Sequence, residues 1–352
     1  MRLPVSIKIA AAAFCAAAAL SCSSVGDPYL KTLRMDMEQL EAIDSINVDR
    51  YDLFQARSVV KADNGWLALS TTKGDYRLLF LNPVTSEHFF AIRNGRGPGE
   101  IIQGSSFHGS GDAAMYYDVN NAVCIRIDLC RTVENKEIAA DTVGVFKGAS
   151  KPVYLARCGD GFVSGNLLDG EAWYSYYDRQ GNVVSSVDAL DFKEITEGGD
   201  FRISFLTSSK YAAAPSGTRV CVASVGSPSL SFAEVKSGLL NEYARYAIPP
   251  SGMVKGRMTA ESRSAFCGLD ADEDYVYAIY SGHSIADDVL PTDECRHLIV
   301  YSWDGSPVRH YRLDHNVNSV HVAGNSLYAT TTYPESCVYR FELPEDLFHA
   351  GR

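Results

Sequence analysis

The sequence is short of positive charge and of long hydrophobic runs. Its 352 residues contain 32 Lys and Arg against 43 Asp and Glu, which gives a formal net charge of −11. Nucleic-acid binding needs a basic face, so this balance argues against a nucleic-acid partner. The apolar run at residues 9–20 is too short to cross a bilayer as a helix.

The spacings that mark common catalytic and metal centres are also missing. The eight histidines never stand in HxH or HExxH spacing, the cysteines form no CxxC pair, and no G-x-S-x-G segment occurs. The acidic run at residues 270–274 lacks the ligand spacing of an EF-hand, and we interpret it as a solvated hairpin turn. We therefore expect no metal, no cofactor and no catalytic residue. His283 is a weak candidate site residue, because it stands in a long polar insertion near Asp287 and Asp288.

The N-terminal region has the layout of a bacterial export signal. Arg2 and Lys8 precede the apolar run, which ends in Ala19-Leu20-Ser21-Cys22. These four residues resemble the lipobox of bacterial lipoproteins, which implies cleavage before Cys22 and acylation of that cysteine. Two alternatives stay open: a secretory peptide cut at an Ala or Ser site, and an uncleaved anchor. We expect a signal peptide at residues 1–21 and a lipidated tether at 22–45, with a possible short helix within 29–43.

Seven cysteines remain after residue 22, and an odd number cannot fully pair. Most stand in apolar, strand-like segments, where free cysteine packs as a small hydrophobe. Core packing is the favoured interpretation, and a disulfide remains open in an oxidising compartment.

From Tyr51 onward, the dominant pattern is alternation or short β-branched and aromatic runs between turn residues. These runs form groups at intervals of roughly 35–50 residues, the range typical of propeller blades. The groups fall at 66–92, 114–127, 152–184, 211–235, 266–303 and 317–343. A meander of this kind cannot bury both faces alone, so neighbouring groups must stack around an axis. The sequence predicts an all-β, six-bladed β-propeller of four-stranded antiparallel blades over residues 46–352, closed by an early strand near 46–53.

A glycine-rich loop follows the first group. It reads Gly95-Arg96-Gly97-Pro98-Gly99-Glu100, and its glycines and proline indicate a special backbone path. It lacks the GK[ST] ending of a P-loop, and no helix follows as in a dinucleotide fold. The loop, behind a lipobox-like segment, resembles that of the TolB-like six-bladed propeller lipoproteins of gut anaerobes, although Ile101 replaces their usual aromatic residue. The resemblance implies fold and envelope location, and it implies no activity.

Two interpretations of the loop stay open. It is a tight crossover in which Glu100 accepts backbone N–H bonds or pairs with an arginine, or it binds an anion. The candidate ligand-binding residues are Arg93, Gly95, Arg96, Gly97, Gly99 and Glu100.

The expected function is that of an envelope-anchored binding or interaction module for a protein, peptide or glycan partner. We expect a bacterial lipoprotein held by its lipid in the cell envelope, in the outer membrane. The alternative function is a metal-dependent hydrolase or lyase of the six-bladed propeller type that acts on a sugar or lactone.

Overall fold

The computed structural model describes residues 27–53, 55–97, 99–146, 152–165, 172–192, 208–254, 257–284 and 295–349. It divides into a short N-terminal unit that ends at Met35 and a large unit from Asp36 to Arg352. The described part of the N-terminal unit holds α2 (Pro28–Thr32). Its N-cap residue is Asp27, whose side chain accepts the backbone N–H of Tyr29 at 2.8 Å. Cys22 and the expected signal peptide lie outside the described residues.

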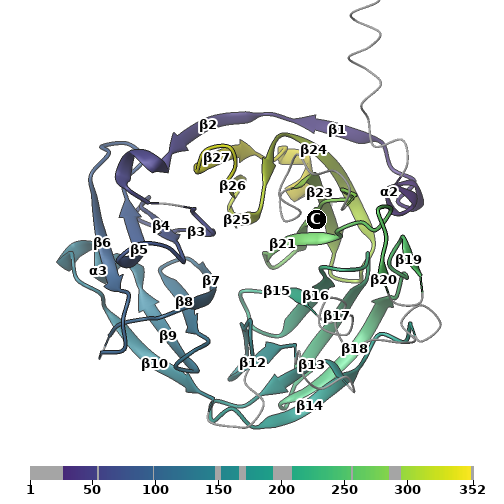
Figure 1. Cartoon of the computed structure of the whole chain (residues 1–352), viewed down its shortest axis with the longest axis horizontal. Helices are drawn as coiled ribbons and strands as arrows, with labels where there is room; N and C mark the ends of the chain where they lie inside the picture. The colour runs from purple at the N-terminus through teal and green to yellow at the C-terminus, as the bar shows by residue number, and fades with distance from the viewer. Residues whose placement is uncertain are drawn as a thin grey trace, which may run out of the picture. The chain divides into compact units, whose positions relative to one another are not determined.

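The large unit is a six-bladed propeller, as predicted, with the blades arranged around a central axis (Figure 1). Blade 1 consists of β3 (Ser58–Lys61), β4 (Leu67–Ser70), β5 (Tyr76–Leu81) and β6 (His88–Arg93). Blade 2 consists of β7 (Gly104–Ser110), β8 (Ala113–Asp118), β9 (Val123–Asp128) and β10 (Ala140–Val145). Blade 3 consists of β11 (Ala156–Cys158), β12 (Gly161–Ser164), β13 (Ala172–Tyr177) and β14 (Val183–Asp188). Blade 4 consists of β15 (Ser209–Ala213), β16 (Arg219–Ser224), β17 (Leu230–Lys236) and β18 (Leu239–Tyr246).

Blades 5 and 6 each recruit a strand from the start of the unit. Blade 5 consists of β21 (Phe266–Ala271), β22 (Tyr275–Tyr280), β23 (Cys295–Ser302) and β24 (Pro307–Val317), with β1 (Met37–Leu40) as a fifth strand parallel to β24. Blade 6 consists of β25 (Ser319–Ala323), β26 (Ser326–Thr331) and β27 (Cys337–Glu342), completed by β2 (Ala42–Asn47). Smaller elements are η1 (Val48–Tyr51), α3 (Leu129–Asn135), the β19 (Met253–Val254) and β20 (Arg257–Met258) pair, and α6 (Glu345–His349).

The predicted closure is confirmed, because β2 pairs antiparallel with β27 and places Ile46 opposite Val338. The start of the propeller and the bounds of the closing strand differ from those expected, however. The propeller sheets begin at Met37 rather than at residue 46, and residues 48–51 form a 3-10 turn. The helix within 29–43 is limited to α2. Residues Met37 to Leu40 instead supply hydrogen bonds to the open edge of β24, and such pairing outweighs a weak helical preference.

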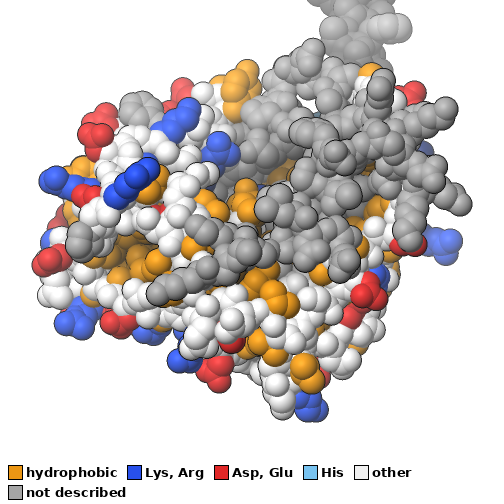
Figure 2. Space-filling model, turned by 60° about the horizontal axis from the view of Figure 1, so that its bottom comes forward, with side chains coloured by type: hydrophobic (Ala, Val, Ile, Leu, Met, Phe, Trp, Pro, Cys, Tyr) orange, Lys and Arg blue, Asp and Glu red, His pale blue; other side chains and the backbone are white. Residues whose placement is uncertain are grey.

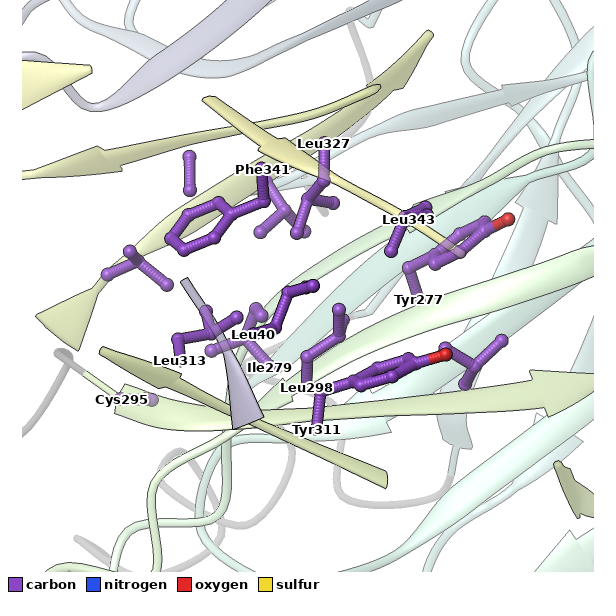
Figure 3. Close-up of a cluster of buried hydrophobic side chains, with 14 of the residues drawn as sticks. Leu40, Tyr277, Ile279, Cys295, Leu298, Tyr311, Leu313, Leu327, Phe341 and Leu343 are labelled. Carbon is purple, nitrogen blue, oxygen red and sulfur yellow. The ribbon is translucent and has the colours of Figure 1, made fainter. Parts of the chain in front are cut away.

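The core consists of apolar clusters that lie between neighbouring blades. Figure 3 shows one of them, in which Tyr277 and Ile279 of β22 and Leu298 of β23 face Leu327 and Phe341 of blade 6. Leu40 of β1 belongs to the same cluster. Full burial of an apolar side chain of this size contributes about 1.5–3 kcal/mol relative to exposure. Blade-to-blade packing therefore stabilises the ring, as the repeated pattern predicts.

Some of the cysteines pack in the core as free thiols, and two form a disulfide. Cys267 of β21 and Cys295 of β23 form a disulfide within blade 5. Cys124, Cys158, Cys221 and Cys337 are unpaired and buried, which confirms the packing interpretation for them. Burial raises the pKa of the Cys124 and Cys158 thiols to about 12, so both stay protonated and unreactive near neutral pH.

Candidate functional site

Two adjoining cavities lie on the propeller axis, lined by the first strands of the blades. The smaller has a volume of about 130 Å³ and is lined by early residues of β3, β7, β15, β21 and β25. The larger has a volume of about 380 Å³ and is lined by later residues of β7, β11, β15 and β21, and by residues of β8 and β9 that include Arg126. The cavities share His108, Tyr211, Leu269 and Asp270. They therefore succeed one another along the same strands, and we call them together the axial site.

Cations dominate the charged residues of the axial site. Arg57, Arg126, Arg157 and Lys210 line it, against the single carboxylate of Asp270 among the described residues. The whole chain has the opposite balance, with a net charge of −11. Acidic and basic side chains are interspersed around the rim of the face in Figure 2. The surplus of cations is thus a property of this cavity, and it favours an anionic ligand.

Asp270 links blade 5 to blade 6 at the smaller cavity. Its Oδ2 atom lies 3.1 Å from Nδ1 of His321 and accepts the backbone N–H of Val322 at 2.7 Å. A carboxylate only accepts, so Nδ1 of His321 carries a proton. The arrangement holds the imidazole in a fixed orientation, with Nε2 as its other polar atom.

His108 on β7 is a second histidine of the axial site. Its Nε2 accepts the backbone N–H of Arg157 at 3.4 Å, which joins blade 2 to blade 3. Burial lowers the pKa of His108 to about 4, and the negative charge of Asp270 acts weakly in the opposite direction. His108 is therefore neutral near pH 7.

Among the described residues, three polar atoms that line the smaller cavity are buried without a hydrogen-bond partner. They are Oγ of Ser105, Nδ2 of Asn318 and Nε2 of His321. Asn318 is only 8% exposed and His321 only 4%. Buried polar groups are nearly always hydrogen-bonded in folded proteins, so this cavity has unused capacity for a polar ligand.

The glycine-rich loop lies elsewhere, in the connection from β6 to β7. Oε2 of Glu100 accepts the backbone N–H of Gly97 at 2.7 Å, and Ile101 returns to pair with Asn94. A Cβ atom on Gly95 would collide with the Glu100 carboxylate, so that side chain would have to move if residue 95 were not glycine. The loop's own carboxylate therefore occupies the position of an anion, as the structural interpretation of the sequence anticipates.

The loop contributes to a side groove between blades 1 and 2 and not to the axial site. Arg96, Gly97, Gly99 and Glu100 line this groove of about 390 Å³ with apolar residues of β9 and β10. Arg93 and Arg96 are exposed to solvent. Anion binding by this loop stays a prediction.

Two other expectations from the sequence differ in outcome. The interpretation of the acidic run at residues 270–274 as a solvated hairpin turn is wrong for Asp270. That residue is the last but one of β21 and faces the axis, and only residues 272–274 form the turn. The carbonyl of His283 accepts the N–H of Ser264, and its neighbours Asp287 and Asp288 lie outside the described residues.

The axial residues were missed because single-sequence patterns show strands and not the channel that they surround. A weak signal existed, since β7 has the polar sequence Gly-Ser-Ser-Phe-His-Gly-Ser. The first strand of each blade is an edge strand that borders the axial cavities, so it needs fewer apolar residues than an inner strand. A polar first strand in a propeller sequence therefore indicates residues that line the axis.

Comparison with known proteins agrees with this architecture. Residues 60–325 match the family described as TolB-like 6-blade propeller-like. A candidate exported protein from Bacteroides fragilis NCTC 9343 shares 11% identity with a TM-score of 0.51, over 88% of this chain and 100% of that one. The Cps50 (Swd1) β-propeller domain of Myceliophteria thermophila shares 11% identity with a TM-score of 0.48, over 86% of this chain and 99% of that one. At these identities the likeness concerns the fold.

No curated protein matches this chain. Within the part of the chain that the structure describes, no group of three or more His, Cys, Asp or Glu side chains is placed to hold a metal ion. Among the same residues, no helix combines the length and apolar character needed to cross a membrane.

Proposed function

Because the chain belongs to the TolB-like six-bladed propeller family, we propose that it is a binding module of the bacterial cell envelope whose axial site takes an anionic partner. One observation carries this proposal. Of the residues that the structure describes, four cationic side chains and one carboxylate line the axial site, in a chain with a net charge of −11. A cavity of one charge sign with low-dielectric walls raises the local concentration of ligands of the other sign.

The envelope location rests on different residues. Arg2, Lys8 and the segment that ends in Cys22 support export and lipid attachment, with the outer membrane as the expected site. The propeller would then face the periplasm or the exterior, where anionic glycans and peptides are available. Mass spectrometry of the mature N-terminus tests this part: an acylated Cys22 supports it, and an unmodified N-terminus at another residue contradicts it.

The binding role is tested with short anionic probes and their neutral counterparts. Full-length protein in detergent is titrated with hexa-aspartate and trigalacturonate, and with hexaglycine and maltotriose. We expect one of the anionic probes to bind about tenfold or more tightly than its neutral counterpart, with an affinity that falls as salt rises. Equal binding of charged and neutral probes would contradict the proposal.

A matched pair of variants locates the binding. Arg57→Gln with Lys210→Gln removes two charges from the axial site. Arg50→Gln with Lys236→Gln removes two charges from exposed positions. We expect the first pair alone to weaken binding by about tenfold. If the two pairs weaken binding equally, only the net charge matters and the axial site is not the binding site.

A hydrolase or lyase that acts on a sugar or lactone is the second candidate. The pairing of Asp270 with Nδ1 of His321 favours it, because it leaves Nε2 available to accept a proton. Turnover of a sugar lactone or oligosaccharide by the purified protein, abolished in His321→Gln, would establish this function.

A further inference from the structure

The three unpartnered atoms of the smaller cavity differ in whether they donate or accept a hydrogen bond. Nδ2 of Asn318 is a donor, and its Oδ1 already accepts the Thr330 hydroxyl at 2.6 Å. Oγ of Ser105 both donates and accepts. Nε2 of His321 is an acceptor in the neutral ring, because Asp270 holds the proton on Nδ1. A ligand that pairs with all three must offer both donors and acceptors.

The same cavity supplies charge and aromatic surface. Arg57 and Lys210 line it, together with the rings of Tyr154 and Tyr211. Nζ of Lys210 lies 5.5 Å from the centre of the Tyr154 ring. Cations are suited to an anionic group, and aromatic rings are suited to the C–H face of a flat, hydroxylated molecule.

These requirements converge on one class of ligand. We propose that the smaller axial cavity binds a single acidic sugar unit, whose hydroxyl groups pair with Ser105, Asn318 and His321 and whose anionic group lies toward Arg57 and Lys210. Each sugar hydroxyl is both donor and acceptor, so a sugar meets the mixed needs of the three atoms, whereas a simple carboxylate does not. This inference rests on the proposed function, because it names the partner as an acidic glycan or a fragment of one.

The first experiment separates the sugar from the charge. Full-length protein is titrated by calorimetry with D-galacturonate, with neutral D-galactose and with cyclohexanecarboxylate. We expect galacturonate to bind about tenfold more tightly than either of the other two. Glucose 6-phosphate serves as a further probe, and its binding in place of galacturonate would identify phosphate as the anionic group of the sugar.

The outcomes distinguish this inference from the proposed function. Equal binding of galacturonate and cyclohexanecarboxylate would overturn the sugar assignment while leaving an anion-binding cavity. If galactose binds as tightly as galacturonate, the ligand need not be an anion, and both this inference and the proposed function are overturned. Binding of none of these probes would overturn the inference and leave the cavity as a site filled by ordered water.

The second experiment uses variants that keep the side-chain hydrogen bonds found among the described residues. Ser105→Ala removes a hydroxyl without a partner, and Asn318→Asp replaces the unpartnered Nδ2 by oxygen while an oxygen stays available to the Thr330 hydroxyl. The controls at exposed positions are Thr72→Val, which also removes a hydroxyl, and Asn241→Asp, which makes the same change of charge. We expect each cavity variant to weaken galacturonate binding by about fivefold or more, with controls unchanged. Wild-type affinity in both cavity variants would refute the placement of the sugar, and circular dichroism confirms folding in each case.

Discussion

Oδ2 of Asp270 lies 3.1 Å from Nδ1 of His321, and this contact joins the first strand of blade 5 to the first strand of blade 6. The same oxygen accepts the N–H of Val322 at 2.7 Å. One carboxylate therefore both orients a histidine of the axial site and ties two blades together. A substitution of Asp270 is therefore expected to affect both the stability of the propeller and the axial site.

Replacing Asp270 by Ala is expected to lower the free energy of unfolding by about 2–4 kcal/mol, because two partly buried donors, Nδ1 of His321 and the N–H of Val322, lose their acceptor. Urea unfolding followed by tryptophan fluorescence measures the change. Asp274→Ala, in the exposed part of the same acidic run, is expected to change stability by less than about 0.5 kcal/mol. Equal effects of the two substitutions would show that the Asp270 contacts contribute little.

Acid is expected to destabilise the propeller through histidines whose pKa is lowered by burial. Burial lowers the pKa of His108 to about 4 and of His310 to about 4. Burial, followed by the charge of His310, lowers the pKa of His297 to about 3, and its Nδ1 lies 3.0 Å from Nε2 of His310. Each folded pKa is below the unfolded value of about 6.5, so the unfolded chain binds more protons between these values. Stability is therefore full above about pH 6.5 and falls toward pH 4.

The slope of this loss can be assigned to one histidine. Each such group contributes up to about 1.4 kcal/mol per pH unit in that window. His108→Gln offers an amide oxygen to the N–H of Arg157 and does not titrate, so we expect the pH dependence of unfolding to decrease by about one proton. His88→Gln, at an exposed position, is the control. An unchanged slope in His108→Gln would mean that His108 binds its proton as readily in the folded protein as in the unfolded chain.

The glycine-rich loop is expected to show strong coupling between Gly95 and Glu100. Gly95→Ala places a methyl group against the Glu100 carboxylate and is expected to cost about 1–3 kcal/mol. In a Glu100→Ala background the same substitution is expected to cost much less. A double-mutant cycle measured by urea unfolding gives the coupling, and additive effects would contradict the packing of the carboxylate within the loop.

The loop arginines test which site binds an anion. Arg93→Gln with Arg96→Gln removes two exposed charges outside the axial site. If the axial site binds the anionic probes, their affinity stays within about twofold of the wild type. A loss as large as that in the Arg57→Gln and Lys210→Gln variant would instead assign the anion to the loop, as the sequence left open.

The disulfide between Cys267 and Cys295 is expected to stabilise blade 5 by about 2–4 kcal/mol. Comparison of urea unfolding with and without dithiothreitol measures this contribution. The Cys267→Ser and Cys295→Ser double variant should resemble the reduced wild type and should not respond to reductant. A reductant effect that persists in the double variant would exclude this disulfide as its cause.

Much of the scaffold followed from the sequence by itself. Alternating apolar residues between turns predicted strands, their recurrence predicted six stacked blades, and an early strand was expected to close the ring. These features depend on local periodicity and on the need to bury one face of each blade, and both are visible along the chain. The role of Glu100 was also foreseen as one of two alternatives, because three glycines around one carboxylate indicate a tight backbone path.

The axial site was decided only by the tertiary structure. Ser105, Asp270 and His321 are far apart in the chain, and each lies in a short first strand with no distinctive spacing. Ring closure brings these strands to one axis, where their polar groups become buried and lie near cationic side chains. The sequence therefore determined which segments become strands, whereas the geometry of the closed ring determined which side chains meet in a cationic cavity.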